Sequence, residues 1–312
     1  MIQEELPDEE IGDLEGLGHT PVLLKEVLEL LAPKPGETVV DATVGAAGHG
    51  AAFAARIEPN GRFVGLDADP IALDLARKAL EPCKCSIQLV QANFAEIGEA
   101  LAGVGIERAD VILADLGLSS MQLDAGGRGF SFRREGPLDM RMDPRLKVTA
   151  ADLVNRLSEK ELGNLIYYNA QEFAARRIAS GIVEARRGTR ITTTTRLAQV
   201  VCSALRVNPD SRRSKIHPAT RTFQALRMAV NQEVASLEGL LQKAPDVLTP
   251  SGRIGVISFH SVEDKLVKLD FRKRANEGIY RIVTKKPIVA EDEERKSNPR
   301  ARSAKLRVAE RM

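Results

Sequence analysis

The feature that most constrains the fold is a repeated alternation of short apolar segments and helical segments in the first third of the chain. Four segments have the length and composition of buried strands: 37–43, 62–67, 86–91 and 109–115. Helix-like segments separate them at 51–57, 71–80 and about 95–102, and Asp69-Pro70 is typical of a helix start. Strands that alternate with helices predict an α/β fold with a parallel sheet covered on both faces.

The alternation stops after Asp115 and resumes only near the C-terminus. Residues 117–145 show little periodicity, whereas 150–205 and 219–244 have the pattern of helices. A strand pattern returns at 252–259, and two later extended stretches are expected to pair antiparallel at the sheet edge. We therefore predict three parts: an acidic, disordered leader (1–17), a sheet domain (18–118 and 248–312), and a mainly helical insertion (119–247).

Charge and composition exclude several classes of protein. The chain carries 45 basic and 43 acidic residues, but seven of the acids lie in the leader, so the remainder is basic and compatible with a polyanionic partner or with a solvated basic face. The sequence lacks an apolar run of the roughly 18–20 residues that a membrane helix needs. Three cysteines and an acidic start argue against a secreted, disulfide-bonded protein, so we expect a cytoplasmic location.

The turn after the first strand is the best candidate for a ligand-binding loop. It spans residues 41–50 and is rich in Gly and Ala, which let a ligand approach the backbone closely. Asp67 stands at the end of the second strand, where a carboxylate accepts hydrogen bonds from the ribose hydroxyls of a nucleoside ligand. A glycine-containing turn followed by such an acid indicates NAD or S-adenosylmethionine.

Spacing and the other strand ends favour S-adenosylmethionine. Residues 45–50 do not match the Gly-x-Gly-x-x-Gly spacing of dinucleotide sites. Asp41 begins the turn, just before its small residues, as is typical of S-adenosylmethionine methyltransferases, in which this acid lies near the methionine amino group. Phe94 follows the third strand, where its ring packs either against an adenine or into the core, and Asp115 ends the fourth. Ligands of open sheets bind beyond the carboxyl ends of the strands, so one site should gather these residues.

Longer irregular motifs make the sequence similar to a known family. The motifs are DLGLSSMQLD (115–124), RGFSF (128–132), GPLDMRM (136–142), HPATR (217–221), FQALR (223–227), SFHSVED (258–264) and NPRARSA (298–304). Together they closely resemble the RsmH (MraW) family, and the resemblance extends from His19 to the end of the chain. Members of this family are bacterial methyltransferases that modify the N4 amino group of a cytosine in 16S ribosomal RNA.

The resemblance implies a fold, a reaction and a set of contacts. The fold would be the Rossmann-like sheet of class I S-adenosylmethionine-dependent methyltransferases, with a helical insertion that recognises RNA. The reaction would be N4 methylation of cytosine 1402 in the small ribosomal subunit. The implied cofactor contacts are Ala47, Gly48, His49, Asp67, Phe94, Asp115 and Gln122.

Two residues in the turn depart from the family pattern. Ala47 stands where the family usually has Gly, and Gly50 stands where it usually has Ser or Thr. A methyl group at position 47 would narrow the room for the methionine end, and Gly50 removes a hydroxyl. These changes support an alternative function, a non-catalytic RNA-binding or ribosome-assembly protein on the same fold. Cofactor binding separates that alternative from the enzyme.

Methyl transfer to an exocyclic amine depends on in-line positioning and on an acceptor for the amine proton. Asp115 is the first candidate for that acceptor, although cofactor binding alone explains it equally well. Asp139 and His260 are weaker candidates, because Asp139 has Arg141 nearby and His260 follows a strand.

Six arginines are candidates for binding RNA phosphates or stacking on bases, or else for structural salt bridges. They are Arg128, Arg141, Arg221, Arg227, Arg300 and Arg302. We expect no metal site, since the pair Cys83 and Cys85 lacks a second pair of ligands. The sequence leaves open whether the protein is a monomer or a homodimer.

Overall fold

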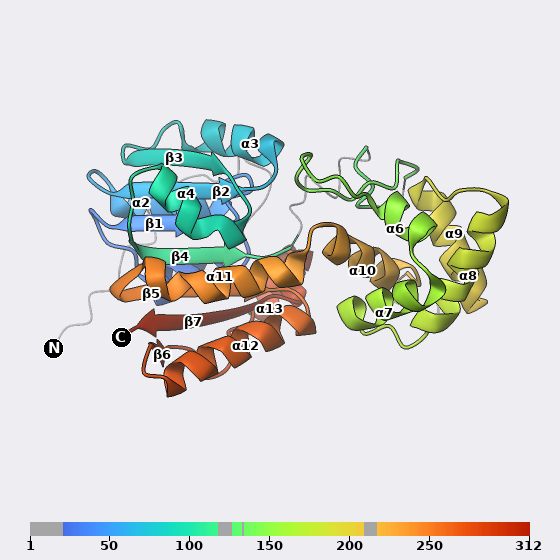
Figure 1. The fold of residues 1–312 in the computed structure, drawn as a ribbon. Coiled ribbons are helices and arrows are strands. Elements are labelled where there is room, and N and C mark those ends of the chain that lie inside the picture. Colours follow the sequence, from blue (N-terminus) through green and yellow to red (C-terminus); the bar gives the residue numbers. More distant parts are fainter. Residues whose placement is uncertain (1–20, 118–126, 133, 209–216) are drawn as a thin grey trace.

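A computed structural model of the chain describes residues 21–117, 127–132, 134–208 and 217–312. It contains two bodies, a sheet covered by helices and a separate group of helices beside one end of that sheet (Figure 1). The predicted leader and Gln122 lie outside the described residues.

The sheet has seven strands in the order β3-β2-β1-β4-β5-β7-β6. Their bounds are β1 (Thr38–Asp41), β2 (Arg62–Asp67), β3 (Ser86–Gln91), β4 (Ala109–Asp115), β5 (Leu248–Ser258), β6 (Tyr280–Ile282) and β7 (Lys305–Arg311). The strands β3, β2, β1, β4 and β5 pair in parallel, whereas β7 pairs antiparallel with both β5 and β6. This confirms the predicted α/β fold and the antiparallel edge.

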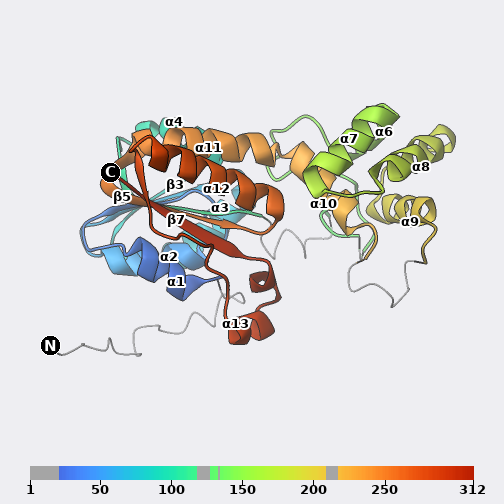
Figure 2. The same cartoon turned by 90° about the horizontal axis from the view of Figure 1, so that it is seen from below.

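Helices cover both faces of the sheet, as Figure 2 shows for α11 and α12 on one side and α1 and α2 on the other. The first group is α4 (Ile97–Gly103), α11 (Glu233–Val247) and α12 (Ser261–Asn276), whose buried residues share one core cluster with the sheet. The second group is α1 (Leu24–Leu31), α2 (Gly48–Ile57) and α3 (Pro70–Leu80), which share the other. Burial on both faces is why these strands are continuous apolar runs.

Two local signals direct the chain out of the strands and into the helices that follow. The Asp69 side chain accepts a hydrogen bond from the backbone N–H of Ile71, and Pro70 occupies the first helical position of α3. After β3, Asn93 forms a capping box with Glu96 around the short 3₁₀ helix η3 (Phe94–Glu96). Both caps stand directly beyond strand ends, and they fix the backbone where a ligand of this fold would bind.

The insertion has a hydrophobic core of its own. Its helices are α6 (Ala150–Arg156), α7 (Glu159–Ala170), α8 (Ala175–Gly188), α9 (Thr194–Leu205) and α10 (Thr220–Val230). Capping boxes at Thr149 and Ser158 begin α6 and α7. The core cluster joins residues of all five helices with Phe130, Leu138 and Met140, so the stretch before α6 folds against the helices.

The predicted end of the insertion at residue 247 differs from the packing in the structure. The helical stretch predicted over 219–244 is two helices, because Asn231 ends α10 and Gln232 adopts a left-handed backbone conformation with φ 51°. Leu237, Leu240 and Leu241 of α11 then pack in the core of the sheet domain. The change from insertion to sheet domain therefore lies between α10 and α11.

The chain is completed by α13 (Asp292–Ser297) and the 3₁₀ helix η4 (Pro299–Arg302), which precede β7. The carboxylate of Glu294 in α13 accepts a hydrogen bond from the backbone N–H of Leu23, 2.8 Å away. Within the described residues, none of the helices has the length and apolarity needed to cross a membrane.

Candidate functional site

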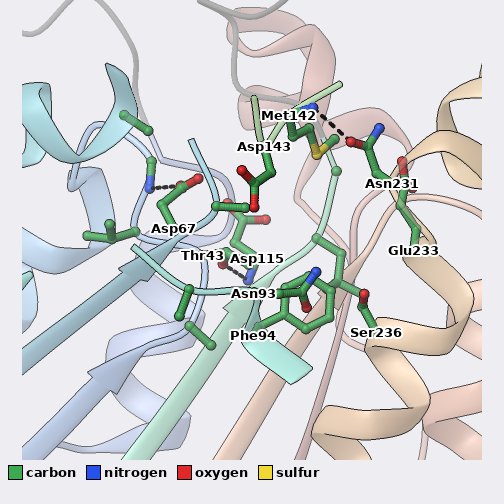
Figure 3. Close-up of a pocket in the computed structure, with 18 of the residues that line it drawn as sticks. Thr43, Asp67, Asn93, Phe94, Asp115, Met142, Asp143, Asn231, Glu233 and Ser236 are labelled. Atoms are coloured by element: carbon green, nitrogen blue, oxygen red, sulfur yellow. Dashed lines mark hydrogen bonds between the residues drawn. The ribbon is translucent and has the colours of Figure 1, made fainter. Parts of the chain in front are cut away.

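A cavity of about 620 Å³ lies beyond the carboxyl ends of the parallel strands. The turn after β1, the ends of β2 and β4, and the segment that follows β3 form one side of it (Figure 3). The opposite side comes from the insertion and its junction with the sheet domain. The residues on that side are Met142, Asp143, Arg145, Leu146, Asn231, Gln232, Glu233, Ala235 and Ser236.

Asp67 lies at the end of β2 and lines the cavity, as the sequence predicts. One of its carboxylate oxygens accepts a hydrogen bond from the N–H of Gly45 at 3.0 Å, and the other accepts from the N–H of Asp69 at 2.9 Å. Each oxygen keeps further acceptor capacity for a ligand. Burial raises the pKa of Asp67 to about 6, against the lowering effect of these backbone donors.

Asp115 lies at the end of β4 and also lines the cavity. Its backbone N–H donates to Thr43 Oγ1 at 2.7 Å, and its Oδ2 is 3.7 Å from His49 Nδ1. Its Oδ1 is buried and has no hydrogen-bond partner among the described residues. Burial raises the pKa of the carboxyl group, although His49 and Arg300 oppose the rise. A buried carboxylate oxygen without a donor is costly, which fits an oxygen that a bound ligand satisfies.

The turn after β1 explains both departures from the family pattern. Gly48 and His49 line the cavity, but Ala47 is fully buried in the core behind them. Ala47 has φ 61°, a left-handed conformation in which glycine is the unstrained residue. The expectation that its methyl group narrows the cavity is therefore wrong, because that methyl group points into the core.

Gly50 is likewise a packing position. A Cβ atom there would approach Phe63 Cζ to 2.8 Å, so a side chain requires the ring to shift. Gly50 is buried and does not line the cavity, so the missing hydroxyl removes no group from the site. Neither departure gives structural support to a disabled cofactor site.

Two further predicted site residues, Phe94 and Asp41, differ in whether they line the cavity. Phe94 lines the cavity and also packs against the sheet core, so its contact with an adenine stays a prediction. Asp41 is buried beneath the turn, where its Oδ1 accepts from the N–H of Thr43 at 3.1 Å, and it does not line the cavity. Burial raises the pKa of Asp41 to about 7. Its expected place near the cofactor's amino group is not supported.

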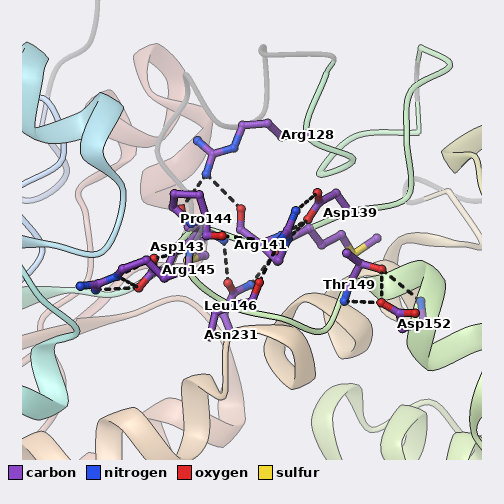
Figure 4. Close-up of polar contacts among 12 residues, drawn as sticks. Arg128, Asp139, Arg141, Asp143, Pro144, Arg145, Leu146, Thr149, Asp152 and Asn231 are labelled. Carbon is purple, nitrogen blue, oxygen red and sulfur yellow. Dashed lines mark hydrogen bonds and ion pairs between the residues drawn. The ribbon is translucent and has the colours of Figure 1, made fainter.

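Arg128 joins the insertion to the sheet domain, and Figure 4 shows its contact with Arg141. Its guanidinium forms an ion pair with Asp69, the cap of α3, and donates to the carbonyls of Arg141 at 2.9 Å and Met142 at 2.7 Å. All these partners are protein groups, and the side chain is largely buried. The structure thus gives Arg128 a structural contact where the sequence suggested a candidate for RNA binding.

Asn231 binds the backbone around Met142, which Arg128 also contacts. Its Oδ1 accepts from the N–H of Met142 at 2.7 Å (Figure 3), and its Nδ2 donates to the carbonyl of Met140 at 2.8 Å. The segment Met142–Leu146 is therefore fixed between Arg128 and Asn231 where it borders the cavity. Sequence reasoning missed Asn231, because it lies inside the helical stretch predicted over 219–244 and that pattern gave no signal of this role.

The other predicted arginines of the insertion have acidic partners. Arg227 makes two hydrogen bonds to Glu233, at 2.7 and 2.8 Å, and both side chains are largely shielded from solvent. Arg141 pairs in the same way with Asp139 and holds the pKa of that carboxyl below its ordinary value. Asp139 is thus engaged by Arg141 and does not line the cavity.

Of the remaining candidates, Arg221 is half exposed, with its Nη1 3.6 Å from a Glu172 oxygen. Arg300 lines the cavity, whereas Arg302 donates through Nε to the carbonyl of Arg295 at 3.1 Å. All six arginines lie within the described residues, and of these six only Arg300 lines the cavity.

His260 is the N-cap of α12, and its Nδ1 accepts from the N–H of Glu263 at 3.4 Å. Its Nε2 lies 3.1 Å from Glu263 Oε1, and Glu233 completes a cluster whose ligand-type atoms lie within 4.8 Å of one another. Such a cluster resembles a metal site, but Arg227 already binds Glu233 and the N–H of Phe259 donates to Glu263. Together with Asp115, these two glutamates form what we call the acidic end of the cavity.

Comparisons with known proteins agree with the geometry. A family model described as the MraW methylase family matches residues 16–312. "Ribosomal RNA small subunit methyltransferase H" of Acidobacterium capsulatum is 46% identical over 94% of this chain and 98% of the relative. Proteins of the same name from Cyanothece sp. and Geobacter sulfurreducens are 48% and 46% identical, over 94% of this chain and 95% and 99% of theirs.

Among solved structures, an rRNA methylase from Streptococcus thermophilus is similar over 93% of this chain and 93% of that chain, with 10% identity and a TM-score of 0.42. The family match covers nearly the whole chain and includes both the sheet domain and the insertion. The chain therefore belongs to the MraW methylase family.

Proposed function

We propose that this protein transfers a methyl group from S-adenosylmethionine to the N4 amino group of a cytosine in 16S ribosomal RNA, at position 1402 as the family resemblance implies. The observation that carries the proposal is the unpartnered Oδ1 of Asp115, buried in a cavity whose walls come from both the sheet domain and the insertion. Relatives named as small-subunit rRNA methyltransferases support the RNA substrate. The reaction would take place in the cytoplasm, on the small ribosomal subunit.

S-adenosylmethionine is the cofactor, and the described residues fit it. Asp67 has acceptor capacity for the two ribose hydroxyls, and the ring of Phe94 offers a face for the adenine. Gly48 and His49, at the N-terminus of α2, border the room left for the methionine end. When bound, the cofactor supplies a methyl group already activated by its positive sulfur.

The chain's own contribution is to position the amine and to take up its proton. The lone pair of an exocyclic cytosine amine is delocalised into the ring, so the amine is a weak nucleophile. Asp115 Oδ1 offers an acceptor that orients the amine and draws on its proton as the new bond forms. The neighbouring His49 and Arg300 favour the ionised carboxylate that this role needs.

The target base must leave its stack before it reaches the cavity, which costs a few kilocalories per mole and less for an irregular RNA. The insertion forms the far wall of the cavity, so the RNA strand that presents the base would pass over that domain. In this proposal the sheet domain binds the cofactor, and the insertion contributes most to the selection of the target.

The test is methyl transfer from labelled S-adenosylmethionine to small ribosomal subunits that lack the modification, with identification of the product nucleoside. We expect N4-methylated cytosine, and transfer slowed by about 10²–10⁴-fold in a variant with Asp115→Asn. Binding of S-adenosylhomocysteine, measured by calorimetry, provides the control for an intact site. If the protein binds this product but yields a different nucleoside, the proposed substrate is wrong.

A further inference from the structure

Three aromatic side chains are exposed together at the corner between α7 and α8. The exposed fractions are 46% for Tyr167, 68% for Tyr168 and 86% for Phe173. The chain contains only nine Phe and three Tyr residues, and the other nine aromatic side chains are buried or half-buried. A quarter of the chain's Phe and Tyr residues therefore lie together in one solvent-exposed place. Packing in a hydrophobic core does not explain why aromatic residues stand there.

Ring contacts and hydrogen bonds of the turn define the structure of this corner. The centroid of the Tyr167 ring lies 5.4 Å from that of Tyr168 and 6.5 Å from that of Phe173, with interplanar angles of 76° and 67°. Edge-to-face contacts of this kind leave ring faces open to solvent. Gln171 turns the chain with φ 50° and donates its N–H to the carbonyl of Tyr167 at 2.8 Å, and Glu172 accepts from the N–H of Ala174.

Packing of α7 does not require these rings. The buried face of the helix consists of Leu162, Gly163 and Ile166, which belong to or border the insertion core. Asn169 fastens the end of the helix by donating through its side chain to the carbonyl of Ala225 at 3.0 Å. The buried face and Asn169 thus hold α7 in place, and the exposed rings remain available for a partner.

The corner stands next to the acidic end of the cavity. Gln171 Oε1 accepts a hydrogen bond from Ser261 Oγ at 3.1 Å, which joins the corner to the first residue of α12. His260 caps that helix, and Glu263 in its first turn lines the cavity. A nucleotide strand that inserts one base at this end of the cavity brings its neighbouring nucleotides to the corner.

The charges around the corner favour a nucleic acid over an apolar protein surface. Arg176 and Arg177, in the first turn of α8, are exposed, and Arg221 of α10 is half exposed beside Glu172. Aromatic faces interspersed with arginines are typical of surfaces that bind unpaired RNA, because bases stack on the rings while the arginines meet phosphates. A contact between two copies of the chain would bring the exposed Arg176 and Arg177 of each copy together, and like charges oppose such a contact.

We infer that Tyr167, Tyr168 and Phe173 form a stacking platform for the unpaired bases that flank the target cytosine. The inference rests on the proposed RNA substrate. Withdrawing one base from its stack leaves its neighbours with exposed faces, and aromatic rings beside the cavity replace the lost stacking partner. Since every base has a π-face, the platform contributes affinity for the strand without reading its sequence.

The test replaces an aromatic side chain with leucine, which is apolar but has no ring on which a base can stack. We expect Tyr168→Leu and Phe173→Leu each to raise KM for undermodified small ribosomal subunits on the order of tenfold. The value of kcat and the Kd for S-adenosylhomocysteine should stay unchanged, and Tyr168→Phe should restore KM. Leu269→Ala is the matched control, because Leu269 is also exposed (51%) but lies on α12, away from the corner.

A second measurement distinguishes the possible partners. A photo-crosslinking phenylalanine analogue at position 173 should form a cross-link to 16S rRNA near the modified cytosine. A cross-link to a ribosomal protein or to a second copy of the chain would overturn the inference, as would unchanged KM values in both leucine variants. If wild-type protein itself transfers no methyl group to the subunits, the proposed function fails before the platform is tested.

Discussion

The two sides of the cavity use charged residues in different ways. On the sheet side, Asp67 and Asp115 stand at strand ends and keep acceptor capacity for a ligand. On the insertion side, Arg128 and Arg227 have their guanidinium groups engaged by acids of the protein. Charge on the sheet side thus serves binding and chemistry, whereas much of the charge on the insertion side holds the walls of the site in position.

The difference follows from how each side is built. A parallel sheet brings the ends of its strands to one edge, so a polar residue placed there faces the ligand without further support. The insertion side includes the segment Met142–Leu146, which lies outside regular secondary structure and needs side-chain partners to hold its backbone. If this division is right, substitutions on the two sides should affect different steps.

The largest expected effect is on the sheet side, at Asp115. Asp115→Asn keeps the shape of the side chain but removes the proton acceptor, so we expect kcat to fall by about 10²–10⁴-fold. The Kd for S-adenosylhomocysteine should change much less. Single-turnover methyl transfer at saturating cofactor measures the first quantity, and calorimetry measures the second. A variant whose rate recovers at high cofactor concentration would show that Asp115 acts only in cofactor binding.

The next effect concerns Asp67, which we assign to the ribose. Hydrogen bonds to a charged acceptor contribute about 1.5–3 kcal/mol each, so Asp67→Asn should weaken S-adenosylhomocysteine binding on the order of a hundredfold. Asp74→Asn, which changes an exposed acid on α3, is the matched control and should leave the Kd unchanged. A thermal melt of each variant checks that the fold is intact. Equal affinities for both variants would remove Asp67 from the site.

The sheet side was predictable because its signals are local. The apolar runs, the turn after β1 and the cap Asp69-Pro70 lie within a few residues of the positions they fix. Topology then brings those positions together, as the pairing of β1 with both β2 and β4 confirms. The resemblance to the family added the identity of the cofactor and of the substrate, which local patterns alone left open.

The insertion side was less predictable because its contacts are distant in sequence. Met142 and Asn231 are 89 residues apart, and Arg128 is 59 residues from Asp69. No periodicity encodes such pairs, so an arginine in a structural contact and one that binds a phosphate look alike in the sequence. The role of Ala47 was misjudged for a related reason, since its left-handed backbone turns its methyl group into the core.

A smaller expected effect tests whether Arg128 supports the cofactor site or binds RNA. Arg128→Gln should weaken S-adenosylhomocysteine binding on the order of tenfold, because the segment Met142–Leu146 loses one of its two supports. Arg187→Gln removes an arginine from an exposed ion pair of α8 and is the matched control. A variant that binds the cofactor normally but loses affinity for the ribosomal subunit would restore Arg128 to the RNA candidates.

Asp69→Asn provides a second route to the same contact. Asparagine still caps α3 but lacks the charge that pairs with Arg128. If the two residues act as a pair, the double variant should bind the cofactor no more weakly than the weaker single variant. Additive losses would mean that Arg128 and Asp69 influence the cavity independently.

The smallest expected effect is a pH dependence confined to the sheet side. The pKa of Asp67 is raised to about 6, so the ligand-free protein holds a proton there more tightly than an ordinary Asp. Ribose hydroxyls donate to the ionised form, so binding must displace that proton and becomes weaker as the pH falls through 6. From a pKa of about 6, the Kd for S-adenosylhomocysteine should rise about fourfold between pH 7.5 and pH 5.5.

Two variants test which group causes this pH dependence. Asp67→Asn should flatten the plot of Kd against pH, leaving only the contribution of Asp115. Arg128→Gln should raise Kd at every pH without changing the shape of the plot. A profile that keeps its slope in the Asp67→Asn variant would assign the proton to another group.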